Sequence, residues 1–484
     1  MRIGLFSVFI LLLALCSFAE ADVGLMLDGS VGVGMSELTG AGHASIYLSR
    51  ACPETPVKLR TCAPGEQGSV ISNYEDFGER AAYDWNVVPL SVFLYGVEDA
   101  RQRPLIATLE MLKALRERQR VTRLRGVCGE TGCPDTAHWR DQIGEALIRE
   151  IYVFAVSTTP QQDEAFIEKF NARANLNRYN GFTRNCADFA REVMNLYFPG
   201  STHADYLNDF FITSPKAISR SFTHYSVERP ALDFHVVRYA QLPGAFRHSD
   251  DPRHGTEVSF RSARWLLLLL TRPHELTLFA ATYAVTGRFN PYHELQRRPS
   301  IIAGNLIEQR DAARRRGDHK AAHEVTAQLK AERVRLLGDD AGWDAYRARF
   351  QELLRSAIAD GVIERHEDLH RFLSEVAAFG HTTFDAQGSP WLEITERGAA
   401  HRIGLTRGTV LAAGSDRALA SRLLLTRMDA VLHQKKKYRE PWEQTVEDQQ
   451  MADALFGPAI QNGSADVAEA GPWQGHVAAA GNRH

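Results

Sequence analysis

The chain has 484 residues, of which 44% are hydrophobic, and a formal net charge of −3 at pH 7. This length and apolar content suffice for two or three globular domains with ordinary hydrophobic cores. The nearly balanced charge favours neither binding to nucleic acid nor purely electrostatic attachment to an anionic membrane. We therefore expect no nucleic-acid partner.

Residues 1–21 have the pattern of a secretory signal peptide. Arg2 precedes an apolar run from 3 to 18, and Ala19-Glu20-Ala21 has the small-x-small pattern of a cleavage site. The run is short for a membrane span, so an uncleaved anchor is the less favoured interpretation. Cys16 lacks the small preceding residue of a lipid-attachment site, although the sequence leaves lipidation open. We expect an exported bacterial protein that is periplasmic or associated with the cell envelope.

Five of the six cysteines lie beyond this segment, an odd number for an oxidising compartment. Cys52 and Cys62 form one close pair, and Cys128 and Cys133 form another. Pairing within each is the simplest connectivity, although the sequence leaves others open. Each closed loop would contribute about 2–3 kcal/mol in the chain-entropy model. Cys186 then remains as a candidate reactive thiol.

Other roles for the second cysteine pair find little support. A zinc site would need two more ligands near Cys128 and Cys133, and only His138 is at hand. The four intervening residues do not match the Cys-x-x-Cys spacing of redox proteins. We expect no metal and no other cofactor.

Residues 42–48 alternate between apolar and polar side chains, which predicts a strand. The glycine-rich segment 28–34 before it is expected to be a turn or a flexible approach. One face of the strand would carry Ala44, Ile46 and Leu48, and the other His43, Ser45 and Tyr47. Periodicity and turn signals predict further strands at 57–61, 69–74 and 151–156, and helices at 105–125, 161–175 and 186–198, the last ended by Pro199-Gly200.

Residues 226–457 form a mainly helical region whose role the sequence does not indicate, with a pair of strands expected within 391–413. The tail at 458–484 has the composition of a disordered segment. Two apolar stretches, at 265–270 and 276–285, are interrupted by charged residues. We expect them to be ordinary core, with a lipid-facing surface as the alternative.

Asn185-Cys186-Ala187-Asp188 has the pattern of a helix start, with Asn185 as N-cap and Asp188 three residues later. Cys186 would occupy the first turn, where unpaired N–H groups and the helix dipole lower the pKa of a thiol. The same N–H groups could hold an acyl-transfer oxyanion. A small buried core cysteine is the alternative interpretation.

His43 is the candidate general base. It lies near the start of the alternating strand, on the face opposite the apolar side chains. A general base needs such a position, in which the strand holds the imidazole rigidly and a substrate can reach it. A structural role is the usual one for an isolated strand histidine, so the assignment depends on its partnership with Cys186.

Taken together, these segments resemble the circularly permuted papain-like cysteine enzymes, an NlpC-related group in which the histidine strand precedes the cysteine helix. Relatives of lecithin retinol acyltransferase have a similar histidine strand and Asn-Cys helix start. A closer similarity is to the periplasmic domain of Lnb-type lipoprotein N-acyltransferases and their uncharacterised relatives. These have a Gly-His-x-x-Leu/Ile strand, a later Asn-Tyr segment, and a tyrosine before an Asn-Cys pair. The similar positions here are His43, Asn73-Tyr74, and Tyr179 with Asn185-Cys186.

The resemblance implies an α+β fold, with a permuted papain-like domain at 22–225 in which a small antiparallel sheet packs with a cysteine-bearing helix. It implies Cys186 as nucleophile and His43 as base, with an orienting residue on the next strand. Asn73 is our choice for that residue, and Ser72, its neighbour on the opposite face, is the alternative. Asn185 and Tyr179 are the candidates for positioning the site or its oxyanion.

We therefore expect a thiol-dependent hydrolase or acyltransferase that acts on an envelope peptide, a peptidoglycan amide or a lipid ester, with association to a membrane surface as a further expectation. The alternative is a non-catalytic envelope protein that keeps the fold as a binding or scaffold module. The sequence does not choose between hydrolysis and transfer, and it gives no oligomeric state.

Overall fold

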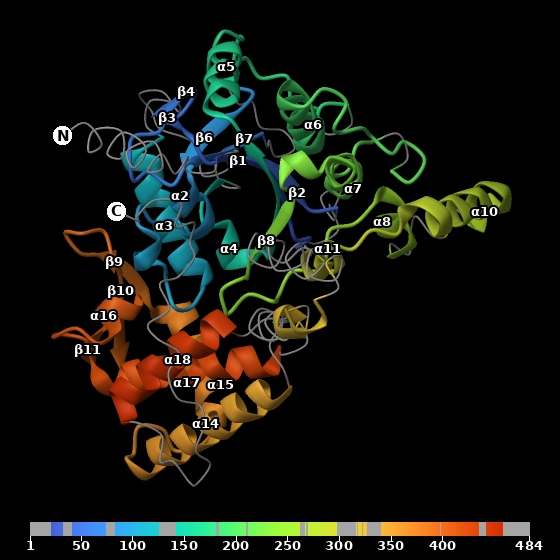
Figure 1. Cartoon of the computed structure of the whole chain (residues 1–484). Coiled ribbons are helices and arrows are strands. Elements are labelled where there is room, and N and C mark those ends of the chain that lie inside the picture. The colour runs from blue at the N-terminus through green and yellow to red at the C-terminus, as the bar shows by residue number, and fades with distance from the viewer. Residues whose placement is uncertain are drawn as a thin grey trace, which may run out of the picture.

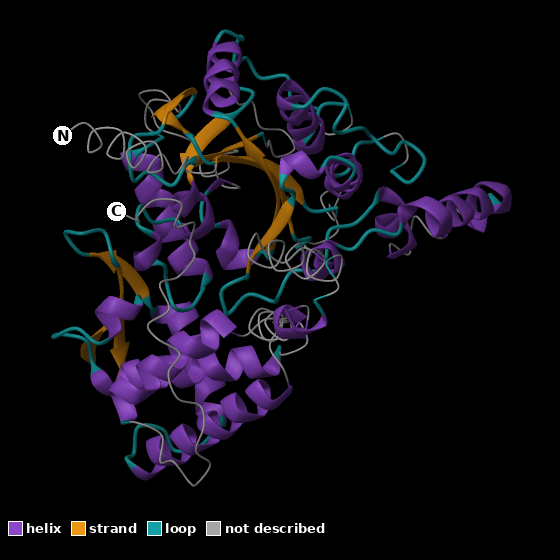
Figure 2. Ribbon diagram, in the orientation of Figure 1, coloured by secondary structure: helices purple, strands orange, loops and turns teal. Residues whose placement is uncertain are grey.

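A six-stranded antiparallel sheet organises the N-terminal half of the computed structural model, in the order β6-β5-β2-β1-β7-β8. The strands curve through the upper half of the molecule (Figures 1 and 2). They are β1 (Ala21–Asp28), β2 (His43–Leu48), β5 (Ser69–Ser72), β6 (Asn86–Pro89), β7 (Ile151–Thr158) and β8 (His235–Tyr239). The α+β class expected from the sequence is confirmed at this level.

The structure describes residues 21–31, 41–73, 83–124, 142–180, 183–209, 212–261, 270–297, 340–396, 398–434 and 442–457, with isolated residues at 267 and between 316 and 326. The expected signal peptide, the Cys128–Cys133 pair and the tail at 458–484 lie outside these residues, apart from Ala21.

Each face of the sheet buries its own set of apolar side chains. Val23, Leu25 and Leu27 of β1 point to one face, which α5 (Pro160–Asn171), α6 (Cys186–Tyr197) and α7 (Pro215–Val227) cover. Met26 points to the other, which α2 (Leu90–Tyr95) and α4 (Glu145–Ile148) cover. The alternation of β2 follows the same division, with Ala44, Ile46 and Leu48 on the α6 side and Tyr47 on the α2 side.

β1 is a strand that the sequence did not predict. It pairs with β2 on one side and with β7 on the other, so it is central to the sheet. Because both of its faces are buried, residues 23–27 lack the polar alternation that marks a half-exposed strand. Asp28, the first residue of the expected glycine-rich turn or approach, belongs to β1, and residues 32–34 of that segment lie outside the described residues.

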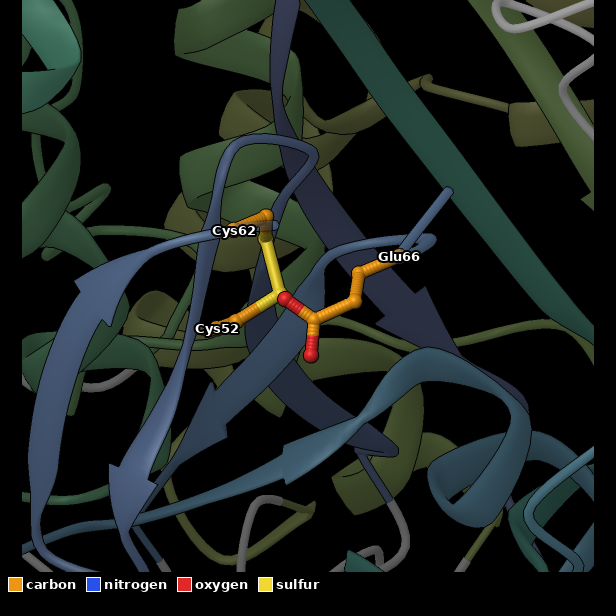
Figure 3. Close-up of side chains that lie close together, drawn as sticks. All are labelled: Cys52, Cys62 and Glu66. Atoms are coloured by element: carbon orange, nitrogen blue, oxygen red, sulfur yellow. A yellow bond between two sulfur atoms is a disulfide. The ribbon is translucent and has the colours of Figure 1, made fainter. Parts of the chain in front are cut away.

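A disulfide joins Cys52 to Cys62, as expected, across the hairpin of β3 (Ala51–Thr55) and β4 (Lys58–Thr61). Figure 3 shows the Glu66 side chain beside the two sulfurs. Glu66 forms a two-pronged ion pair with Arg60 of β4, at 2.7 Å for each nitrogen–oxygen contact. Because both sulfurs are in the disulfide, this group is a covalent staple rather than a metal site.

The sheet continues past residue 225, since β8 is its last strand. η3 (Pro230–Leu232) precedes β8, and after β8 come α8 (Gly255–Arg261), α10 (Pro273–Thr282), η4 (Tyr283–Gly287) and α11 (Pro291–Arg297). Tyr292 and Leu295 of α11 pack with the α6-side core. The strand content of the N-terminal domain therefore extends beyond the boundary placed at 225.

The C-terminal region is mainly helical, as expected. It contains α14 (Asp340–Ala359), α15 (Glu367–Phe379), α16 (Arg407–Val410), α17 (Arg417–His433) and α18 (Trp442–Phe456), with a small antiparallel sheet of β9 (His381–Phe384), β10 (Pro390–Glu396) and β11 (Ala399–Gly404). Helix α3 (Leu109–Thr122), which follows η1 (Ala100–Gln102), shares its core with these helices. The two halves therefore share one hydrophobic core through α3.

Helix α10 projects away from the rest of the molecule, at the right of Figure 1. Several large apolar side chains in and beside it face solvent, among them Leu267, Leu270, Leu278 and Val285, the last 82% exposed. The expectation that 265–270 and 276–285 form ordinary core is wrong for these residues. In the part of the chain that the structure describes, no helix is long and apolar enough to span a membrane.

Candidate active site at the start of strand β2

Cys186 is the first residue of α6, and its position follows from a complete capping box. The Asn185 side-chain oxygen accepts hydrogen bonds from the N–H groups of Ala187 and Asp188, at 2.9 and 3.1 Å. The Asp188 carboxylate accepts the N–H of Asn185 in return, at 3.3 Å. The helix start predicted from the sequence is confirmed, and the thiol is held in the first turn.

The same cap changes the expected oxyanion site. Because Asn185 takes the N–H groups of Ala187 and Asp188, those donors are already satisfied. The Asn185 amide in turn donates to the carbonyl of Thr213, at 2.9 Å. Asn185 therefore positions the helix start, and the N–H of Cys186 itself is the first-turn group that the cap leaves for an oxyanion.

The thiol lies in a buried environment, 8% exposed. Burial raises the pKa of Cys186 to about 12, and the charge of Asp28 raises it further. The N–H groups of Ala44 and Ala187 and the charge of Arg149 act in the opposite direction, but burial outweighs them. The expectation that the helix start lowers the pKa of Cys186 is thus wrong, because desolvation of the thiol exceeds the effect of the helix terminus.

His43 opens β2 and is 1% exposed. Its Nε2 forms a hydrogen bond with the Ser72 hydroxyl, at 2.7 Å. Ser72 ends β5 and pairs with Ser45, so it lies on the same face of the sheet as His43. The structure thus brings the alternative orienting residue, Ser72, to the imidazole.

Asn73 lies elsewhere. Its amide donates to the carboxylate of Asp84, at 2.9 Å, and to the Asp84 carbonyl. Asp84 is buried and also forms an ion pair with Arg184, at 2.6 Å, just before the cap of α6. Asn73 therefore connects the end of β5 to the approach to Cys186 through Asp84, a link that the sequence did not indicate.

Asp28 is a second residue that sequence reasoning missed. It pairs directly across from His43 in the β1–β2 register and is fully buried. Residues paired in this way have Cβ atoms about 4.5–5.5 Å apart and project on the same face. A strand over residues 21–28 places Asp28 on this face, but the sequence predicted a turn or a flexible approach at 28–34.

The Cys186 thiol lies against the backbone of β2 at Ala44, the residue after His43. β5 ends at Ser72, opposite Ser45, so the β2–β5 pairing stops one residue short of Ala44. The N–H of Ala44 points to the Cys186 sulfur there. Helix α6 covers the face of β2 opposite the one on which the His43 side chain lies. Cys186 thus lies next to His43 along β2, with α6 on one side of the sheet and the His43 side chain projecting to the other.

Tyr179, the other positioning candidate, lies in the segment between α5 and α6 and is half-buried. Its N–H donates to the Asn177 side chain, at 2.8 Å. The next residue, Asn180, exchanges two backbone hydrogen bonds with Arg184, each 3.0 Å. Tyr179 therefore belongs to the turn that leads into α6.

A hollow of about 390 Å³ lies on the outer side of α6, and Arg184, Asp188 and Arg191 are among its lining residues. Its lining does not include Cys186 or His43. Both arginines form ion pairs with carboxylates of α6, which offset their charge at this surface.

Comparison with protein-family models, with curated proteins and with solved structures found no match for this chain.

Proposed function

We propose that the chain is an exported thiol-dependent hydrolase or acyltransferase with a permuted papain-like domain. Cys186 is the nucleophile and His43 the general base, and the acyl donor is an envelope peptide, a peptidoglycan amide or a lipid ester. The observation that carries this proposal is the position of the Cys186 sulfur against the N–H of Ala44, the residue after His43.

The chemistry follows from the groups present. His43 takes the thiol proton as the sulfur attacks the acyl carbonyl, and the N–H of Cys186 faces the oxyanion. Collapse of the tetrahedral intermediate breaks the bond to the leaving group, which receives the proton from His43. Water, an amine or a hydroxyl then attacks the thioester, with His43 again moving the proton, and restores the thiol.

Ser72 and Asp28 would orient the imidazole. Ser72 engages Nε2, so Nδ1 is the nitrogen that would exchange the proton with Cys186. Asp28, paired across from His43, supplies a negative charge on the same face, which would stabilise the imidazolium formed during the reaction. In this proposal Ser72 takes the orienting role first given to Asn73.

The raised pKa of Cys186 sets a requirement on the reaction. A thiol with a pKa of about 12 is almost entirely protonated at neutral pH. Attack must therefore be coupled to proton transfer to His43, and contacts around the thiol must open before an acyl group can reach it.

The test is hydrolysis and transfer with three donor classes: p-nitrophenyl acyl esters, peptidoglycan peptides and diacyl lipids. We expect turnover with at least one class, abolished in Cys186→Ala and lowered at least about 100-fold in His43→Ala, as is typical for loss of a general base. Ser45→Ala is the matched control, since Ser45 lies on the same face of β2. Full activity in Cys186→Ala would overturn the proposal.

The burial of Cys186 favours a second candidate, a non-catalytic envelope scaffold in which the cysteine is a core residue. This candidate predicts that Cys186→Ala folds and keeps every function of the chain, with no turnover of any acyl donor by the wild type. The same assay therefore separates the two.

We also propose that α10 and the turn that follows it, residues 273–287 (the α10 arm), rest on a lipid surface of the envelope. Leu278 in α10 and Val285 just after it are exposed on a helix that projects from the body. An apolar arm that lies in the interface buries such side chains without crossing the bilayer.

A further inference from the structure

Three histidines gather around one buried aspartate between two helices of the C-terminal region, far along the chain from the thiol site. His366 precedes α15 and His370 lies in its first turn, while Asp429 and His433 lie near the end of α17. The spacing of four residues on each helix places both members of a pair on one face. α15 and α17 pack against each other, in the lower part of Figure 1.

Each carboxylate oxygen of Asp429 faces an imidazole. His366 Nε2 lies 2.9 Å from one oxygen, and His370 Nε2 lies 3.6 Å from the other. The rings of His370 and His433 are 5.5 Å apart between centroids. One ligand atom each from His370, Asp429 and His433 lies within 4.8 Å of the other two.

We propose that His370, Asp429 and His433 bind a divalent transition-metal ion of the zinc type. Two imidazoles and a carboxylate are a donor set that such ions prefer. His366 holds the other carboxylate oxygen and so acts as the partner that orients Asp429. Three protein ligands leave the fourth tetrahedral position open to solvent.

Only small movements of exposed side chains are needed to bring the three ligand atoms to one ion. In a tetrahedral site with bonds of about 2.0–2.1 Å, any two ligand atoms lie about 3.3 Å apart. Asp429 is buried, so it serves as the fixed ligand, whereas the His370 side chain is 58% exposed and His433 is exposed as well. Rotation of these two side chains brings their nitrogens to the ion, which would then clamp the end of α17 to the start of α15.

The probe is Zn²⁺, titrated by calorimetry into chelator-treated full-length protein, with Co²⁺ absorption to report the ligand geometry. We expect one ion per chain, tetrahedral Co²⁺ bands, and a rise in the unfolding temperature on adding Zn²⁺. His370→Ala and His433→Ala should remove the binding and the temperature rise. His366→Ala should weaken binding about 10–100-fold, as is typical for an orienting partner.

His401→Ala is the matched control, because His401 forms a single imidazole–carboxylate pair with Asp416, at 2.9 Å. Its Zn²⁺ affinity should equal that of the wild type. Unfolding temperatures without metal show that each variant is folded. Absence of Zn²⁺ binding to the wild type, or equal affinity in wild type, His370→Ala and His433→Ala, would overturn the proposal.

Discussion

At the residue scale, the buried thiol makes stability depend on pH. The pKa of Cys186 is raised from an ordinary value of 9.0 to about 12 in the folded chain. Between these values the unfolded chain loses the proton and the folded chain keeps it, so the unfolded state binds fewer protons and stability falls as pH rises. We predict that the urea midpoint of the wild type falls from pH 8 to pH 10 more steeply than that of Cys186→Ala. Equal slopes in the two proteins would contradict this.

The two adjacent polar residues at the end of β5 should behave differently. Ser72 binds the His43 ring, and Asn73 binds Asp84. We predict that Ser72→Ala lowers kcat and shifts the pH profile of kcat/KM, because the imidazole loses its orienting partner. Asn73→Ala should chiefly lower stability, by about 1–3 kcal/mol, because it leaves Asp84 with one fewer buried partner. A pH profile altered by Asn73→Ala and not by Ser72→Ala would restore the first assignment.

At the scale of elements, the α10 arm gives a direct test of lipid contact. Full burial of an apolar side chain contributes about 1.5–3 kcal/mol. The double variant Leu278→Asp/Val285→Asp should therefore bind phosphatidylcholine vesicles at least about tenfold more weakly than the wild type in a flotation assay. Leu411→Asp, at an exposed leucine on another part of the surface, is the control. Equal flotation of all three proteins, or none for the wild type, would count against lipid contact.

The elements that the sequence predicted are those whose local pattern matches their environment. β2 alternates because its α6 face carries only apolar side chains and its other face carries His43, Ser45 and Tyr47, and α6 begins at a capping box formed by neighbours in sequence. β1 was missed because a central strand buried on both faces has no alternation. Because β1 was not predicted, Asp28 was not recognised as a residue that faces His43.

The remaining part of the site depends on register and on distant contacts. A shift of one residue along β5 moves a side chain to the opposite face, so Ser72 and Asn73 could not be separated without the strand pairing. The link from Asn73 through Asp84 to Arg184 joins residues over a hundred positions apart. No local signal encodes such a contact, and the exposure of α10 is likewise a consequence of tertiary placement.

At the scale of the whole molecule, Arg427 joins the two halves. Its side chain is fully buried and forms ion pairs with Asp448, at 2.5 Å, and Glu447, at 3.1 Å. It also donates to the carbonyl of Leu105, in the segment that leads to α3. A contact of this kind ties α17 and α18 to the N-terminal half.

We predict that Arg427→Ala lowers the free energy of unfolding by about 3–5 kcal/mol, because it leaves the buried Asp448 carboxylate without its cation, whereas Glu447 keeps its ion pair with Arg103. Arg101→Ala, which removes the exposed ion pair with Asp99, should leave that free energy nearly unchanged. Denaturant unfolding measures both. Similar small losses in the two variants would mean that Arg427 does not hold the halves together.

The central claim is that Cys186 forms a thioester with His43 as its base. Mass spectrometry of the protein quenched during turnover of an acyl donor tests it most directly. We predict one acyl group on the peptide that contains Cys186, released by hydroxylamine, formed more slowly in His43→Ala and at the normal rate in Ser45→Ala. Turnover of the donor with no adduct on Cys186, and with its rate unchanged in Cys186→Ala, would contradict the account.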